Sequence, residues 1–301
     1  MYAGGCQDNN GSKQFANDKY VILYNNSAFE ADLSKICLGT INPYNSNIDN
    51  NRDYVNGELR YKNENWIPAG TGFWFFQNNV KLAPWGQIVI NINGAINNTI
   101  TYTNSINFAN KDYYCCYDIE IFSNTSLYPA PASEIPTLHY LKAVRLPLAK
   151  GNAWTFSQIS PAFYIFTPLT MSIADFNVDT NSDDEYSDGQ ARKKVPVDWI
   201  VDGIEVFKAG ATNNKKRLTD AVDAGYIEHT NAFGRTLYRN VDAQATKAIA
   251  GNEAKLVYGY SKDPSGIDAE ASIKNGARIV YKDTNNSTND FHEREKASIK
   301  E

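Results

Sequence analysis

Short apolar runs rich in aromatic residues recur along this chain and are separated by turns rich in Asn and Gly. Residues 19–24, 72–76 and 87–92 are clear examples. Aromatic and β-branched side chains suit the pleated surface of a strand, whereas Asn and Gly suit tight turns. The chain holds 19 Tyr, 14 Phe and 5 Trp in 301 residues, enough to bury a sizeable core. The sequence therefore predicts a mainly β globular protein.

The charge and hydropathy of the chain exclude two broad classes of function. The formal net charge is -5 at pH 7, so no global positive field attracts nucleic acid. No run approaches the roughly 18 apolar residues that span a bilayer. The first residues also lack the basic and apolar regions of a signal peptide. We expect no nucleic-acid partner and no membrane-spanning segment.

Local patterns predict several further elements. Residues 19–24 are apolar on both faces, which is typical of a central strand. Residues 41–65 form a polar loop with a short hairpin at Asn56-Gly57, and Asp202-Gly203 predicts a hairpin turn between two strands. The alternation of residues 72–76 places neighbouring aromatic side chains on opposite faces of one strand. Four weaker predictions are β-prone stretches at 113–122, 138–145 and 154–167, a Pro-rich connector at 128–136, a short helix at 215–224 and a frayed charged tail at 292–301.

Five short segments taken together resemble the scattered signature of a lamin-tail-type domain. They are KYVILYNN (19–26), ADLS (31–34), LAPWGQIVI (82–90), GRTLYRNVD (234–242) and DTNNSTNDF (283–291). The chain is similar in particular to a family of envelope lipoproteins in Bacteroidota. The pattern departs at Lys35, where the family usually has Gly, and at Trp85. We therefore expect no left-handed backbone at Lys35 and an exposed Trp85 at the tip of a turn.

The resemblance implies a lamin-tail, immunoglobulin-like β-sandwich with a large internal insertion. Residues 1–301 would form one domain, in which segments 15–98 and 197–291 pair with each other. Residues 99–194 have no lamin-tail counterpart and would be the insertion, and 292–301 would be the tail.

The resemblance also implies a function and a location. It suggests a non-enzymatic lipoprotein that acts as an accessory or ligand-capture partner of a TonB-dependent outer-membrane receptor. The membrane attachment would be an N-terminal lipid anchor upstream of this sequence, and the protein would lie at the cell surface or in the periplasm. Because binding functions usually sit in loops and insertions, residues 99–194 are the expected partner-binding element.

Exposed aromatic side chains suggest an alternative function, a surface adhesin or glycan-binding module. Trp74, Trp85, Tyr113 and Tyr114 are the candidate ligand- or partner-binding residues, because aromatic faces bind sugars and proteins. The competing interpretation is that these side chains form a core covered by the insertion.

An enzyme is not expected. The sequence contains no nucleophile elbow, zinc-protease, Walker A or dinucleotide-binding motif. His139, His229 and His292 are the only histidines, and no Ser or Cys is tied to one by local sequence. No catalytic residue is therefore assigned.

The densest acidic segment, 179–189, is the candidate metal site. Oxygen side chains at Asp179, Asn181 and Asp183 resemble the start of a calcium loop. However, Asp184 stands where that loop needs Gly, and Gln190 where it needs Glu. The prediction is either weak Ca²⁺ binding at Asp179, Asn181, Asp183 and Asp184 or a plain solvated loop, with no other cofactor.

The four cysteines fit no zinc template. In an exported protein an even count suggests disulfides, and a Cys6–Cys37 bridge is the pairing that we consider first. A bridge between the neighbours Cys115 and Cys116 is the least expected. The alternative is four buried free thiols that pack as small apolar groups.

Overall fold

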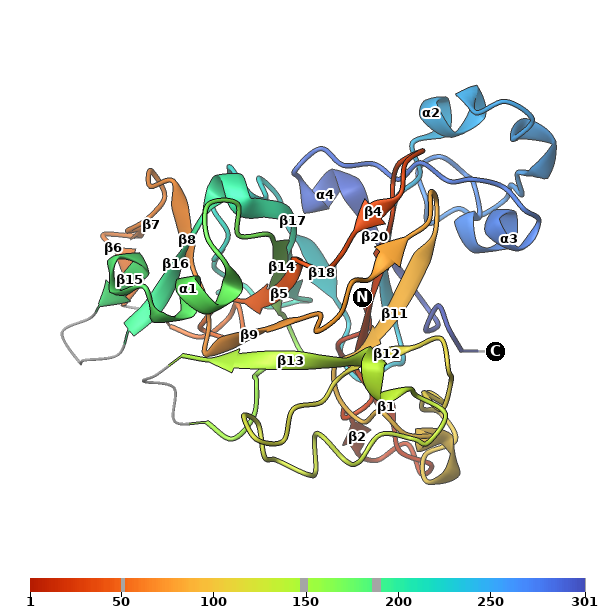
Figure 1. Ribbon diagram of the computed structural model, residues 1–301. Coiled ribbons are helices and arrows are strands. Elements are labelled where there is room, and N and C mark those ends of the chain that lie inside the picture. The colour runs from red at the N-terminus through yellow and green to blue at the C-terminus, as the bar shows by residue number, and fades with distance from the viewer. Residues whose placement is uncertain (50–51, 147–150, 186–190, 301) are drawn as a thin grey trace.

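The predicted mainly β fold is confirmed by a computed structural model, which describes residues 1–49, 52–146, 151–185 and 191–300. Nine strands form one large curled sheet at the centre of the molecule (Figure 1). In sheet order they are β18 (Ile227–His229), β17 (Ile200–Lys208), β14 (Ala162–Phe166), β5 (Cys37–Thr40), β9 (Gly72–Phe75), β13 (Tyr140–Arg145), β12 (Tyr114–Cys116), β11 (Gln87–Asn91) and β3 (Tyr20–Tyr24).

The segment 99–194 is not an insertion beside a finished sandwich. It supplies β12, β13 and β14, and each of them lies between two other strands of the large sheet. Strand β17 pairs with β14, and not with a strand of the described part of 15–98. Segments 15–98 and 197–291 therefore do not pair directly in this sheet, because β14 lies between them. They do share one core, to which Val21 and Leu38 contribute from the first segment and Ile204 and Leu237 from the second.

The concave side of the curled sheet encloses the main core. Leu38, Trp74, Ile90, Leu141 and Val206, each from a different strand, are buried there. The Trp74 ring lies 5.5 Å from the ring of Phe122 and 6.4 Å from that of Trp154. Burial of such large rings supplies much of the free energy of folding.

The opposite face of β9 is also buried. Phe73 packs against Phe166 and Phe176, in a second core that includes Val195 and Trp199. This layer comes from α1 (Ile173–Val178) and from a small sheet of β15 (Asp183–Glu185), β16 (Ala191–Pro196) and β8 (Trp66–Pro68). The alternation predicted for residues 72–76 is confirmed, and both faces of the strand are covered.

A C-terminal hairpin and the first residues of the chain lie along the β3 edge of the sheet. The hairpin is β19 (Thr236–Arg239) with β20 (Phe291–Arg294). Tyr2 exchanges two backbone hydrogen bonds with Tyr20 of β3, and Met1 exchanges two with Leu237 of β19. Strand β3 is thus the edge strand of the large sheet and not the predicted central one, although these neighbours cover it.

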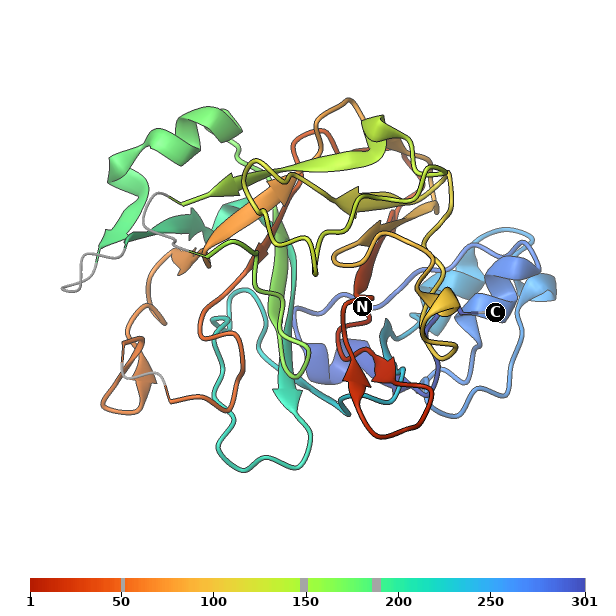
Figure 2. The same ribbon diagram turned by 90° about the horizontal axis from the view of Figure 1, so that it is seen from below.

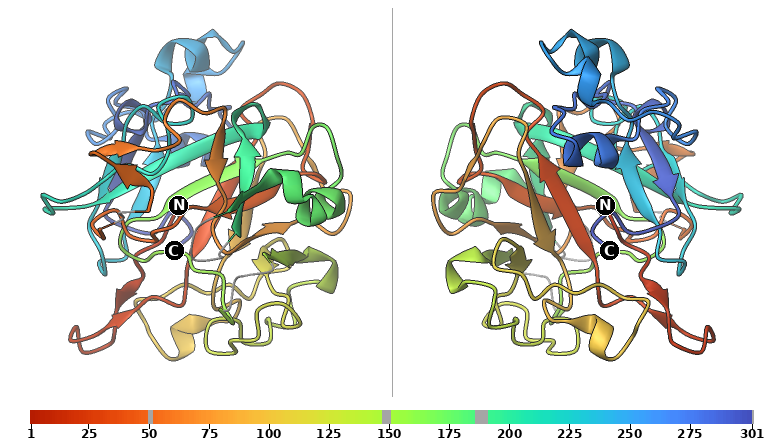
Figure 3. Two further views of the ribbon diagram at one scale, coloured as in Figure 1. Left: turned by 90° about the vertical axis from the view of Figure 1, so that its left-hand side faces the viewer. Right: turned by 90° about the vertical axis from the view of Figure 1, so that its right-hand side faces the viewer.

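Two of the remaining helices, α2 (Ala243–Ala248) and α3 (Ala269–Lys274), form a lobe with its own small core. Val241, Ile267 and Ile279 are fully buried in this core. The short helix α4 (Ser287–Asp290) lies apart from the lobe (Figure 1), and Ser287 donates two hydrogen bonds to the Asp223 carboxylate. The views in Figures 1 and 2 place α2 and α3 at the end of the molecule opposite to α1, and Figure 3 shows them from both sides. No helix in the described part of the chain is long and apolar enough to cross a bilayer.

Several short elements complete the described chain, and one of them tests a turn prediction. The hairpin at Asn56-Gly57 is confirmed, because both residues have positive φ, 52° and 82°, as a two-residue hairpin turn requires. The short strands are β1 (Cys6–Gln7), β2 (Gln14–Phe15), β4 (Ala31–Asp32), β6 (Tyr54–Val55), β7 (Glu58–Leu59) and β10 (Lys81–Leu82). The 3₁₀ turns are Asn98–Ile100, Thr137–His139, Thr180–Ser182, Val197–Trp199 and Glu253–Lys255.

The predictions for the middle segments have mixed outcomes. The β-prone stretches each contain a strand, and the Pro-rich segment 128–136 is irregular, as predicted. The prediction of a turn at Asp202-Gly203 is wrong, because both residues lie within strand β17. Glycine is needed there for close packing, since a Cβ on Gly203 would lie 2.8 Å from Val222 Cγ1. The helix predicted at 215–224 is also absent, and turns stand in its place.

The tail and the cysteines also differ from expectation. Residues 292–300 are docked and not frayed: Ala297 is buried, and the Ser298 hydroxyl lies 2.8 Å from the Tyr20 hydroxyl. All four cysteines are buried free thiols, so the predicted Cys6–Cys37 disulfide is wrong. Cys37 packs in the core beside α1, while Cys6 lies in the β1–β2 hairpin, so the two belong to different parts of the fold.

One fully buried ion pair joins three segments of the fold. Glu205 of β17 accepts hydrogen bonds from Arg217 Nε at 2.9 Å and from the backbone of Arg217 and Leu218. Arg217 Nη1 in turn donates to the carbonyls of Pro43 and Tyr44. Because both charges are out of contact with water, removal of one leaves the other uncompensated.

We expect Glu205→Gln to lower the free energy of unfolding by about 3–5 kcal/mol, because it leaves the Arg217 charge buried without a counter-ion. Urea unfolding followed by circular dichroism measures the change. Glu58→Gln, which breaks the exposed pair with Lys62, is the matched control and should cost less than about 1 kcal/mol. A Glu205→Gln loss as small as that of the control would contradict the prediction.

Candidate functional site

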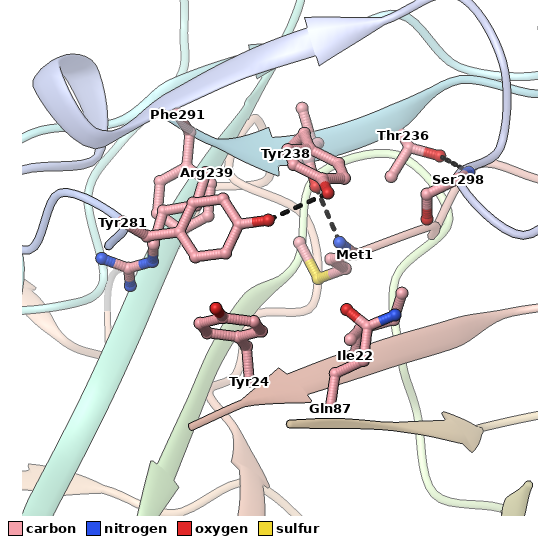
Figure 4. Close-up of a pocket in the computed structure, with 11 residues that line it drawn as sticks. Met1, Ile22, Tyr24, Gln87, Thr236, Tyr238, Arg239, Tyr281, Phe291 and Ser298 are labelled. Carbon is pink, nitrogen blue, oxygen red and sulfur yellow. Dashed lines mark hydrogen bonds between the residues drawn. The ribbon is translucent and has the colours of Figure 1, made fainter. Parts of the chain in front are cut away.

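A small cavity lies between the β3–β11 side of the sheet and the C-terminal hairpin. Its volume is about 110 Å³. Figure 4 shows Tyr24 facing Tyr238 and Tyr281 across this space, with the Met1 side chain between them. The other residues that line it are Ile22, Gln87, Thr236, Leu237, Arg239, Phe291 and Ser298.

The phenol groups of this cavity are already hydrogen-bonded. The hydroxyls of Tyr238 and Tyr281 lie 3.0 Å apart, and the Tyr24 hydroxyl donates to the Ile279 carbonyl at 2.7 Å. Burial raises the pKa of Tyr24 to about 12, and burial also raises the pKa values of Tyr238 and Tyr281. The phenols are therefore protonated at neutral pH and offer no base.

A second cavity of about 90 Å³ adjoins the first across Met1, Ile22 and Phe291. At its rim Arg239 donates to both carboxylate oxygens of Asp202 and lies 4.6 Å from the Phe291 ring centre. Burial raises the pKa of Asp202, and the positive charge of the adjacent Arg239 partly offsets this rise. Pockets for drug-sized ligands have roughly 300–1,000 Å³, so these two cavities are better explained as gaps in the packing of the hairpin.

A larger groove of about 780 Å³ lies between α1 and the large sheet. Its floor is the β9–β13 surface at Phe75, Ala143 and Val144, and the loop before α1 forms its wall. The wall residues are Pro168, Leu169, Thr170, Met171, Ser172, Ile173, Ala174 and Asn177, and Lys35 stands at the rim. The groove has the size of a ligand-binding site, and most of its lining is apolar.

Two features of the groove favour an occupant. Leu169 is 61% exposed, so an apolar side chain stands in water at its wall. Asn177 Oδ1 is buried and has no hydrogen-bond donor among the described residues. A buried acceptor without a donor costs free energy, which a ligand that carries an N–H group would recover. We call this site the α1 groove.

The α1 groove is held open by local structure in the wall. Ser172 caps α1, with its hydroxyl oxygen accepting from the Asp175 N–H at 3.0 Å, and this side-chain cap fixes where the helix begins. Phe176 points the other way, into the core beneath β9. The wall is therefore anchored on one side and open on the other.

The four aromatic residues predicted to bind a ligand or partner do not form one exposed surface in the structure. Trp74 is 0% exposed, so its prediction as a binding residue on the surface is wrong: the concave face of the sheet buries it. Tyr114 is half-buried and stacks on His139, with ring centres 4.1 Å apart. The Tyr113 ring is half-buried as well, and the Tyr113 carbonyl lies 3.1 Å from His139 Nδ1.

Trp85 lies apart from these residues, at the turn between β10 and β11. It is half-buried, with a left-handed backbone (φ 60°) and its N–H bonded to the Ser27 carbonyl at 3.2 Å. Phe29, which the sequence analysis did not single out, is 80% exposed on the loop that pairs with this turn. Lys35 has no positive φ, as expected.

The predicted calcium ligands are bound to other partners. Asp179 caps the turn at Thr180–Ser182, where it accepts from the backbone and side chain of Asn181. Asp183 pairs with Lys193. Asp184 pairs with Arg192 at 3.2 Å and with Arg60, so its charge is neutralised by the protein. Gln190 lies outside the described residues.

In the described structure the four predicted ligands bond to one another and to cations of the protein. Asp183 and Asp184 are neighbours on β15 and therefore point to opposite sides of the strand. Within the described ranges, no group of three or more His, Cys, Asp or Glu side chains is arranged to hold a metal ion. Asp183 and Asp184 instead fasten β15 to β16 and to the 53–62 hairpin, while Asp179 and Asn181 stabilise the turn before β15.

The comparisons with known proteins place the chain in a family. A family model described as "Protein of unknown function (DUF4876)" matches residues 83–298. The chain belongs to this family. It is also similar to the crystal structure at 2.50 Å resolution of a DUF4876 family protein from Bacteroides thetaiotaomicron VPI-5482, with 20% identity and a TM-score of 0.67. That similarity covers 97% of this chain and 68% of the other, and it supports the fold alone. No curated protein matches the chain.

Sequence reasoning missed the α1 groove. Phe75, Val144 and Met171 lie far apart in the chain, and each reads as an ordinary strand or loop residue. Only the pairing of β9 with β13, and the return of the chain through α1, brings them together. No spacing in the sequence signals this site.

The buried His292 makes the folded protein less stable at low pH. Burial, and secondarily the charge of Arg294, lowers the pKa of His292 from 6.5 to about 4. The unfolded chain takes up a proton near pH 6.5 that the folded protein excludes until about pH 4. Stability is therefore lost as the pH falls through this window.

We expect the loss of stability between pH 7 and pH 5 to be smaller in His292→Gln than in the wild type, by about 1–2 kcal/mol. Urea unfolding of both proteins at the two pH values measures it, and the other titrating groups are common to both. Equal losses in the two proteins would show that His292 titrates normally.

Proposed function

We propose that this DUF4876 protein is a non-enzymatic binding protein whose α1 groove captures an extended, apolar segment of a partner protein. The observation that carries the proposal is the combination of an apolar groove of about 780 Å³ with the unpaired acceptor Asn177 Oδ1. Apolar walls supply affinity, and a buried acceptor selects a partner that donates an N–H, as a peptide backbone does.

The proposed partner and location rest on the resemblance to envelope lipoproteins. In this proposal the protein is held at the outer membrane by an N-terminal lipid anchor, facing outward or into the periplasm. There it serves as an accessory of a TonB-dependent receptor, and the receptor or its ligand supplies the bound segment. The wall of the groove lies within residues 99–194, the segment expected to carry a partner site.

Glycan binding by exposed aromatic residues is the weaker alternative. Trp74 lies in the core, and His139 stacks on one face of Tyr114, so one of the four candidate residues is inaccessible and another is partly covered. The half-buried Trp85 and Tyr113 and the exposed Phe29 keep this alternative open.

Deletion of residues 99–194 is not a useful test, since it would remove β12, β13 and β14 from the sheet. A point variant on the exposed wall is sharper. We expect Leu169→Asp with Met171→Asp to reduce capture of a detergent-solubilised outer-membrane receptor at least about tenfold, because two charges would be desolvated on binding. Quantitative pull-down followed by mass spectrometry provides the measurement.

Val178→Asp is the matched control. Val178 is 72% exposed at the end of α1 and does not line the groove. It should leave capture unchanged, and all variants should keep the wild-type melting temperature within a few degrees. If the groove variant captures the receptor as well as the control does, the proposal fails. Retention on immobilised glycans that is lost with Phe29→Ser would favour the alternative.

A further inference from the structure

A second groove, distinct from the α1 groove, lies at the opposite end of the molecule beside α3. Its volume is about 470 Å³. The loop before α3, the exposed side of that helix and the segment after β20 form its walls. The lining residues are Tyr260, Ser261, Lys262, Asp268, Glu270, Lys274, Arg294, Glu295, Lys296, Ala297, Ser298 and Lys300. We call it the basic groove.

The lining has a positive charge excess on a protein whose net charge is -5. Two of its three carboxylates, Asp268 and Glu270, are paired with Arg294 at 3.5 Å and 3.0 Å. Lys262, Lys274 and Lys296 are exposed, and no ion pair to a carboxylate is found for them in the described structure. A local concentration of unpaired lysines focuses a positive potential in a concave site.

Arg294 differs from the lysines because it is fixed in place. It is 6% exposed, and its guanidinium carbon lies 4.0 Å from the Tyr238 ring centre and 4.2 Å from that of Tyr260. Its Nε lies 3.3 Å from His292 Nε2. Its Nη2 is buried and has no acceptor among the described residues, so one donor of a rigid cation is unsatisfied.

We propose that the basic groove binds the oxyanion group of a small acidic ligand, a carboxylate, sulfate or phosphate. The exposed lysines attract the anion, and Arg294 is the preorganised donor at the floor of the groove, held between two tyrosine rings. The planar N–H donors of a guanidinium match the geometry of such oxyanions. When the guanidinium is buried, water does not reach its free N–H groups, so an anion can satisfy them instead. The groove has a volume of about 470 Å³, which suits a small molecule better than a polymer.

Isothermal titration calorimetry with sodium phosphate, sodium sulfate and sodium citrate as separate probes tests the proposal. The wild type should bind at least one of them saturably in the millimolar range or tighter. The anion that binds best identifies the chemistry of the natural ligand group. We expect Lys262→Ala with Lys296→Ala to weaken that binding by about fivefold or more, since two unit charges near the anion are removed.

Lys13→Ala with Lys111→Ala is the charge-matched control. Both are exposed lysines outside the groove, so the net charge changes by the same amount. The control should change the affinity less than about twofold. Equal weakening in both double variants, or no saturable binding of any probe, would overturn the proposal. The α1 groove variants do not alter the basic groove. A negative result for oxyanion binding therefore does not affect the proposed partner binding, and a negative result for partner binding does not affect the proposed oxyanion site.

Discussion

The structure depends on covering the β3 edge of a curled sheet. An open strand edge presents unpaired N–H and C=O groups, which a soluble protein must pair or cover. Here the backbones of Met1 and Tyr2 join β3 to β19, and β20 completes the hairpin on the outside. These segments bring Leu237 of β19 into the main core, and they help to shield its aromatic side chains from water.

The same closure explains where the two grooves lie. The sheet buries Trp74 on its concave side and Phe73 on its convex side, so neither face of β9 is free at its centre. Open surface remains where the covering layers end, at the wall before α1 and beside α3. The lining of one groove is mostly apolar and that of the other is basic, so the fold presents two chemically different grooves.

Local patterns predicted local structure well and long-range pairing poorly. The Asn56-Gly57 hairpin and the alternation around Trp74 follow from backbone preference and side-chain period, which act over a few residues. Asp202-Gly203 has the same turn signature, yet Gly203 lies within a strand because β14 pairs beside it and Val222 packs over it. The metal prediction identified a cluster of oxygen ligands, but Lys193 and Arg192 of the paired strand β16 and the distant Arg60 form ion pairs with Asp183 and Asp184.

The amino-acid sequence by itself determined that this protein is mainly β and that both faces of the strand at residues 72–76 carry aromatic side chains. It also determined the position of the tight turn at Asn56-Gly57. Each of these rests on interactions between residues close in sequence. The tertiary structure decided the strand order, the use of 99–194 as the middle of the sheet, the docking of 292–300 and both grooves. These depend on contacts between residues that are not neighbours in the sequence, such as Tyr20 with Ser298, and no local pattern encodes which of the possible partners will be met.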